Sequence, residues 1–291
     1  MNHRTAGERL FDIGNNAFML VLMFVCLYPF WYVLAASFSD PAWIAETRGM
    51  IWLPHGLSLE SYKAVFNNPI IMTGYLNTLF VVAVGTFVNV LMTALGAYVL
   101  SRSHFMMRNP IMFLIVFTMF FNGGLIPNYM VVNGLGLVDN LWALILPVAM
   151  NAFNLIIMRT AFQSVPVSLE ESARLDGAND FTILFRIVLP LSMPVVAVMI
   201  LFYGVAHWNS WFNALIYMRD RGHYPLQLIL REILISNSTD SMTANSGGNK
   251  LQVALTIKYA TIIVATGPIL ILYPYLQKFF VKGVMIGAIK E

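Results

Sequence analysis

Two long apolar runs of this chain are separated by a polar stretch, EESARLDGANDFTILFRIVLP, at residues 170–190. Ser168 followed three residues later by Glu171 is the pattern of a capping box, which starts a helix just after Pro166. Gly177 is the residue type that ends a helix in the left-handed conformation. The stretch therefore predicts a short helix that stops at a bend.

A second short helix is predicted directly after this bend. Four apolar residues have the spacing i, i+3, i+4 and i+7, which places them in one stripe: Phe181, Leu184, Phe185 and Val188. Pro190 lacks an N–H group and ends the α-helix. Polar side chains are then left to face water or a partner: Glu170, Arg174, Asp176 and Asp180. An ordinary cytoplasmic loop with amphipathic helices is the alternative to a docking element.

The composition places the chain in a membrane. Hydrophobic residues make up 58% of it and charged residues 11%, and the mean hydropathy is +0.71, far from the balance of a soluble domain. Several charge-free windows reach the length of about 20 residues that a bilayer-spanning helix needs. We therefore predict an all-α integral membrane protein of one domain, residues 1–291, with six transmembrane helices at 17–36, 71–100, 110–132, 140–158, 191–217 and 259–277.

Basic residues set the expected orientation. The short segment 102–108 carries Arg102 and Arg108 and no acidic residue, which is typical of a cytoplasmic loop. Both termini and the 159–190 loop are therefore expected in the cytoplasm, in a multi-pass protein of the bacterial cytoplasmic membrane. The first apolar run is longer than the roughly 7–15 residues of a cleavable signal peptide, so we expect a retained helix. The net charge of +3 requires no nucleic-acid partner.

Several function classes lack their sequence signatures. The six windows hold no Asp, Glu, Lys or Arg, whereas ion-coupled transporters usually keep such a residue in the membrane. No G-x-x-x-x-G-K-[ST] loop is present, so the chain is not expected to bind ATP itself. The five histidines show no metal-ligand spacing, and the H-E-x-x-H and G-x-S-x-G motifs do not occur. We therefore expect no catalytic residue, metal or cofactor, and an intramembrane enzyme is disfavoured.

Neutral polar and aromatic residues lie within or beside the predicted spans. Sugar rings offer hydroxyl groups to amide side chains and flat C–H faces to aromatic rings, so such residues suit an uncharged or weakly charged carbohydrate. The candidate substrate-binding residues are Asn154, Tyr203, His207, Asn209 and Trp211. The alternative for each of them is a hydrogen bond between helices, which is worth roughly 0.6 to 2 kcal/mol.

The spacing inside the polar stretch resembles a known signature. Glu171, Ser172 and Ala173 are followed after three residues by Gly177, and after nine more by I-x-L-P, which ends at Pro190. This resembles the EAA signature by which permease subunits of ABC importers dock onto their ATPases, with Ser172 in place of the usual Ala. The resemblance implies coupling helices at about 168–189 and an ATPase-coupling set of Glu170, Glu171, Ala173, Asp176, Gly177, Ala178, Phe181, Phe185 and Pro190.

Further stretches extend the resemblance to nearly the whole chain. FFNGGLIPNYMVVNGLGLVDNLWALILP at 120–147, HWNSWFNALIYM at 207–218 and YPLQLILREILI at 224–235 resemble carbohydrate ABC importer permeases of the maltose-transporter type. Within them the chain is similar to the LplC/YtcP-like branch and to one permease of alginate-oligosaccharide importers. The resemblance implies a type I importer fold and import of a sugar or oligosaccharide, including alginate or other uronate oligosaccharides.

The resemblance also implies partners. These are a second homologous permease, an ATPase pair that binds ATP and Mg²⁺, an extracytoplasmic solute-binding protein and the membrane lipid. The connection 218–258, which includes a Gly- and Ser-rich loop at 236–248, is expected to contact the binding protein, and the tail at 279–291 is expected near the ATPases. Two alternatives remain open, namely a permease for a peptide or another polar solute, and an autonomous channel or facilitator.

Overall fold

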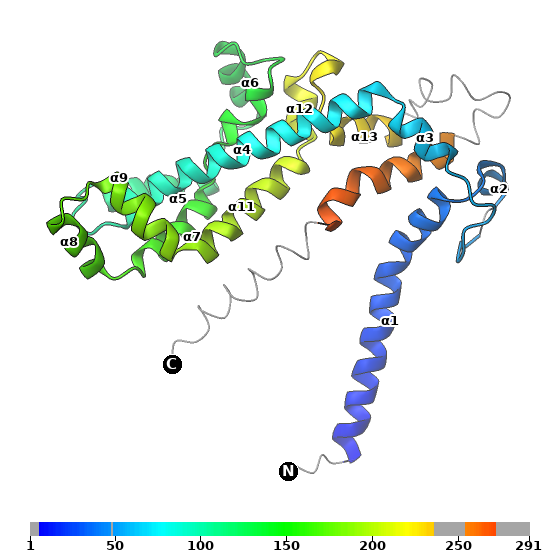
Figure 1. The fold of residues 1–291 in the computed structure, drawn as a ribbon, viewed down its shortest axis with the longest axis horizontal. Helices are drawn as coiled ribbons and strands as arrows, with labels where there is room; N and C mark the ends of the chain where they lie inside the picture. The colour runs from blue at the N-terminus through cyan, green and yellow to red at the C-terminus, as the bar shows by residue number, and fades with distance from the viewer. Residues whose placement is uncertain (1–5, 48, 236–253, 272–291) are drawn as a thin grey trace. The chain divides into compact units, whose positions relative to one another are not determined.

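The computed structural model describes residues 6–47, 49–235 and 254–271, and every regular element within these ranges is a helix (Figure 1). The loop at 236–248 and the tail at 279–291 lie outside the described residues. By their contacts the residues form two units. Of the described residues, those within 6–69 and 232–267 make up the terminal unit, and those within 70–231 and 268–271 make up the main unit.

The terminal unit begins with α1 (Ala6–Ser37), followed by α2 (Pro41–Glu46) and α3 (Glu60–Phe66). Most apolar side chains of α1 are exposed, as expected of a helix built to lie among lipids or other helices. A small core forms where α1 ends, with Ala36 and Ile51 fully buried. Ser61 donates a 2.7 Å hydrogen bond to Thr256, which joins α3 to the helix Ala254–Ile271.

The main unit is organised around one long helix, α4 (Pro69–Ser101). It is continuous over 33 residues, and its buried positions include the small residues Gly85 and Ala97. The same unit contains α5 (Arg108–Phe120), α6 (Leu125–Gly134), α7 (Ala152–Gln163), α11 (Met193–Trp208), α12 (Phe212–Tyr217) and the first part of α13 (Leu226–Ile235). The main core contains Leu155, Met158 and Phe162 of α7 and Met199 of α11, all fully buried.

Three of the predicted spans are broken. Three single helices are long and apolar enough to cross a membrane, namely Gly7–Ser37, Pro69–Ser101 and Ala254–Ile271. Three bent pairs bring the number to six if each pair forms one span. These are Arg108–Phe120 with Leu125–Gly134 (117°), Leu141–Val148 with Ala152–Gln163 (53°) and Asp180–Leu191 with Met193–Trp208 (88°). The division into one domain with six spans therefore stays a prediction.

Local chemistry explains where the breaks fall. Gly124 has φ of +87°, which side chains with a Cβ rarely adopt, and it separates α5 from α6. Asn151 accepts a hydrogen bond from the N–H of Asn154 at 3.2 Å and so starts α7 anew after the 3₁₀ turns η1 (Leu141–Leu144) and η2 (Leu146–Val148). The predicted windows 110–132 and 140–158 are therefore each interrupted by a bend at these residues.

Candidate functional site

The first helix of the polar stretch, α8 (Val167–Leu175), ends as predicted at Gly177. Gly177 has φ of +83°, and its N–H donates to the carbonyl of Arg174 at 3.0 Å. The N–H of Ala178 donates to the carbonyl of Ala173 at 2.9 Å. These two bonds together form the Schellman motif, which satisfies the last carbonyls of a helix. The left-handed cap at Gly177 is confirmed.

The start of α8 differs from the prediction. The helix begins just after Pro166, as expected, but Pro166 itself occupies the N-cap position, with φ of −59° and ψ of 128°. Ser168 therefore lies inside the first turn, where its carbonyl accepts a 2.9 Å bond from the Ser172 hydroxyl. The capping box of Ser168 and Glu171 was wrong, because the N-cap lies two residues before Ser168 and no side chain caps the helix. Glu171 is left exposed.

The second helix contains a wide turn that the spacing did not predict. Asn179 caps α9 (Asp180–Ile183) through a 2.8 Å bond from the N–H of Thr182. A π-helical segment, η3 (Leu184–Val188), follows and leads into α10 (Leu189–Leu191), which contains Pro190. A π turn closes i→i+5 bonds, so the 3.6-residue period is lost there.

The wide turn sorts the predicted apolar stripe into two groups. Leu184 and Val188 are buried, whereas Phe181 is 65% exposed and Phe185 46% exposed. A single stripe across all four residues was therefore wrong. Phe181 and Phe185 are instead exposed residues of the polar stretch, as are Asp176 and Gly177.

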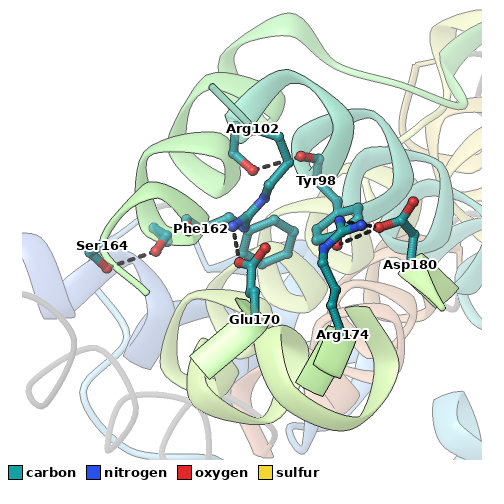
Figure 2. A network of polar contacts seen from close by, with 9 residues as sticks. Tyr98, Arg102, Phe162, Ser164, Glu170, Arg174 and Asp180 are labelled. Atoms are coloured by element: carbon teal, nitrogen blue, oxygen red, sulfur yellow. Dashed lines mark hydrogen bonds and ion pairs between the residues drawn. The ribbon is translucent and has the colours of Figure 1, made fainter. Parts of the chain in front are cut away.

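Glu170 was expected to face water or a partner, but the structure buries it against Arg102 (Figure 2). Its exposed fraction is 4%, and that of Arg102 is 8%. Arg102 Nη1 bonds Glu170 Oε1, Arg102 Nη2 donates to the carbonyl of Phe162 at 3.2 Å, and the guanidinium lies 4.8 Å from the centre of the Tyr98 ring. Burial lowers the pKa of Arg102 from its ordinary value. The pair joins α8 to the end of α4 and to α7.

A second, exposed ion pair spans the bend at Gly177. Arg174 Nη2 lies 2.5 Å from Asp180 Oδ1, and the Tyr98 hydroxyl donates to the same oxygen at 3.4 Å (Figure 2). Both charged side chains are largely exposed. Exposed pairs contribute only about 0–1 kcal/mol, so the Schellman motif and the buried pair are the main determinants of the geometry.

Leu175 is a surface residue that the sequence reasoning missed. It is 90% exposed at the last position of α8, beside the exposed Asp176 and Glu171. A large apolar side chain held in water at a helix end is typical of a contact surface rather than of a loop that packs on its own protein. Its position outside any 3.6-residue stripe was the signal that could have identified it.

Three of the five candidate substrate residues are buried between helices. The Tyr203 hydroxyl lies 2.7 Å from Thr93 Oγ1 of α4 and accepts the Asn151 N–H at 3.1 Å. His207 Nε2 lies 3.2 Å from Asn89 Oδ1. Asn154 is 6% exposed. Tyr203 and His207 thus join α4 to α11 within the protein, and a contact of these residues with substrate stays a prediction.

Asn209 and Trp211 occupy the break between α11 and α12. Both are exposed, and Asn209 Nδ2 donates to the Val205 carbonyl at 3.0 Å. Trp211 is 38% exposed, and the guanidinium of Arg231 lies 4.8 Å from the centre of its ring. The sequence analysis did not select Arg231, because it lies 20 residues from Trp211, on α13.

Asp139 holds two loops together on the side of the chain predicted to be extracytoplasmic. It has φ of +64°, and its Oδ1 accepts the N–H groups of Arg219 and Asp220, both at 3.0 Å, and lies 3.2 Å from His223 Nδ1. The N–H bonds from Asp220 and Arg219, followed by the contact with His223, lower the pKa of Asp139 to about 2. The carboxylate therefore ties residues 218–223 to the segment before η1.

An apolar groove lies along α4 and α11 in the main unit. Its volume is about 630 Å³, and its lining includes Phe87, Leu91, Ile200 and Trp208. The hydroxyl groups of a sugar would lose their hydrogen bonds to water there without replacement. The groove is therefore a poor site for a carbohydrate.

An all-helical chain with apolar spans and an exposed, rigidly capped pair of polar helices has the architecture of a membrane transport permease. The chain belongs to the family described as binding-protein-dependent transport system inner membrane component, which it matches over residues 4–286. The resemblance to ABC importer permeases is thereby confirmed.

Relatives narrow the class to carbohydrate transport. The chain is 45% identical to the polygalacturonan/rhamnogalacturonan transport system permease protein YtcP of Bacillus subtilis. The match covers 97% of this chain and 99% of that protein. It is 42% identical to the protein LplC of the same organism, over 99% of this chain and 97% of that one. A solved chain of a bacterial ABC transporter involved in the import of the acidic polysaccharide alginate matches with a TM-score of 0.91 and 32% identity, over 96% of this chain and all of that one. This chain is a carbohydrate ABC importer permease with the type I fold.

Proposed function

We propose that this chain is one of two different permease subunits of an importer that moves a uronate-containing oligosaccharide across the bacterial cytoplasmic membrane by ATP-driven alternating access. The observation that carries the proposal is the exposed surface of α8 and α9, which is held in place by the Gly177 cap and by the buried Arg102–Glu170 pair. A transporter that worked alone would have no use for such a surface.

An ATPase dimer is the partner proposed for this surface. Leu175 offers an apolar contact, Glu171 and Asp176 offer charge, and Phe181 adds an aromatic ring. ATP and Mg²⁺ are bound by that partner, and this chain needs no cofactor of its own. In this arrangement both termini and the 159–190 loop lie in the cytoplasm, and a solute-binding protein delivers the sugar from the other side.

The substrate class follows from the relatives and from one contact. Polygalacturonan and alginate, which two related systems transport, are both polymers of uronic acids. Trp211 offers an exposed ring for a sugar face, and Arg231 beside it offers the planar N–H fork that binds carboxylates. We place substrate contact at Asn209, Trp211 and Arg231. Asn154, Tyr203 and His207 are buried and are the second group proposed to meet the substrate.

Reconstitution in vesicles tests the proposal. The chain alone is expected to show neither ATP hydrolysis nor uptake. With the second permease, the ATPases and the binding protein it is expected to show both, with oligogalacturonate or oligoalginate preferred over a neutral oligosaccharide of equal length. Uptake by the purified chain alone, driven by an ion gradient, would contradict the proposal. Equal uptake of neutral and acidic sugars would remove only the uronate assignment.

A further inference from the structure

We propose that Arg102 is a positioning residue that fastens α8 to the cytoplasmic end of α4 through Glu170, so that α4 follows any displacement of α8. The inference rests on the proposed function, in which the ATPases move α8. It concerns a residue outside the signature-like stretch and assigns Glu170 to the interior side of that stretch. Glu170 is thus removed from the docking surface on which Glu171 remains.

The two faces of α8 support this assignment. Glu170 points toward Arg102 (Figure 2) and is almost fully buried. The neighbouring Glu171 is exposed, as is Leu175 at the helix end. Successive residues of a helix lie about 100° apart, so the two adjacent glutamates face different surroundings. One side of α8 is therefore available to a partner, while the other side contacts the rest of the permease.

The ion pair between Arg102 and Glu170 is costly to break. Pulling Glu170 away from Arg102 would leave two charges buried without a partner, which costs far more than the loss of an exposed ion pair. Arg102 is itself held at two further points, by its bond to the Phe162 carbonyl and by the Tyr98 ring beneath it. The end of α4, the end of α7 and α8 therefore meet at one side chain.

The helix on the other side of the contact reaches far into the protein. At 1.5 Å per residue, the 33 residues of α4 span about 50 Å. Along this length, Thr93 bonds Tyr203 and Asn89 bonds His207, both on α11. Near its other end, Thr78 Oγ1 accepts the N–H of Leu226 at 2.8 Å. A displacement passed to α4 at Arg102 therefore meets the proposed substrate region.

The experiment measures the number of ATP molecules hydrolysed per sugar transported, in the complete reconstituted importer. Arg102→Gln and Glu170→Gln are expected to retain the ATPase subunits while this ratio rises at least tenfold. The charge-swapped double variant, Arg102→Glu with Glu170→Arg, is expected to lower the ratio again relative to either single charge reversal. Substrate-stimulated hydrolysis and uptake by the wild-type complex establish the proposed function separately.

Arg159→Gln is the matched control. Arg159 of α7 lies at the same end of α4, where its Nε donates to the Leu100 carbonyl at 2.9 Å. The variant therefore removes one cation near this end of α4 and leaves the contact between Arg102 and Glu170 in place. Its ratio is expected to stay within about twofold of the wild type.

Three results would overturn the inference: a wild-type ratio in both glutamine variants, loss of the ATPase subunits from them, or no improvement in the swapped variant. If Arg102→Gln does not assemble, Arg102→Lys is used, which keeps the charge but lacks the fork that contacts Glu170 and Phe162 together. A wild-type ratio in Arg102→Lys would equally overturn it.

Discussion

Gly85 of α4 lies so close to His207 of α11 that a Cβ atom at position 85 would come within 2.6 Å of His207 Nε2. Gly85→Ala is therefore expected to push the imidazole away from Asn89 and to lower the free energy of unfolding by about 1–3 kcal/mol, as overpacking usually does. Gly204→Ala on α11 is the control, because the new atom would meet Thr86 Oγ1 at an ordinary 3.6 Å. Thermal unfolding in detergent measures both, and equal stability of the two variants would contradict the prediction.

Gly177→Val should disturb the bend between α8 and α9 through backbone strain alone. Among the described residues no atom lies within 4 Å of the added Cβ, but φ of +83° costs a residue with a Cβ about 1–2 kcal/mol or more. We expect normal membrane insertion with loss of bound ATPase or of coupled hydrolysis. Gly177→Asn, which tolerates this conformation better, should retain more of both. Wild-type values in the valine variant would show that the bend is not needed for coupling.

Leu175→Ser tests the exposed apolar end of α8. Because the side chain is 90% exposed, the stability of the permease should change by less than about 0.5 kcal/mol. The amount of co-purified ATPase should nevertheless fall severalfold. Glu171→Ala should have a smaller effect of the same kind. Val167→Ser, also exposed but at the other end of α8, is the comparison, and an equal loss of ATPase in that variant would argue against a specific role of Leu175.

Trp211→Ala and Asn209→Ala are expected to reduce uptake severalfold while assembly and basal ATP hydrolysis stay close to wild type. Both residues lie at the break between α11 and α12, outside the buried core clusters of the described residues, so the fold should survive even though Trp211 loses its contacts with Phe212 and Arg231. Arg231→Gln should lower uptake of an acidic oligosaccharide more than uptake of a neutral one of the same length. Unchanged transport in the Trp211 variant would place substrate contact elsewhere.

Asp139→Asn tests the pH dependence of the loop anchor. A carboxyl group whose pKa is about 2 when folded and 3.8 otherwise stabilises the fold above pH 3.8, and this contribution is lost as the pH falls toward 2. Asparagine tolerates φ of +64° and removes only the charge. Amide hydrogen exchange at residues 219–220 should be faster in the variant above pH 3.8, and the difference should vanish toward pH 2. A difference that persists at low pH would contradict the assignment.

The predictions that were confirmed depend on single residue types or on the overall composition. The Gly177 cap follows from the conformational freedom of one residue type, and the membrane class follows from composition. The burial of Glu170 could not be foreseen, because its partner Arg102 lies 68 residues away. The single stripe that grouped Phe181 and Phe185 with Leu184 and Val188 was wrong because a π turn has no period that a spacing rule recognises. The broken spans depend on Gly124 and Asn151, whose residue types are common inside apolar runs as well.

The π turn at Leu184–Val188 makes this region tolerant of a change in chain length. A π turn holds about one residue more than an α turn, so deleting one residue from it would leave a regular helix whose later residues keep their direction. Leu184 and Val188 would then be three residues apart and would still share the buried side of the helix. The same deletion inside the regular helix α11 would rotate every later residue of that helix by about 100°.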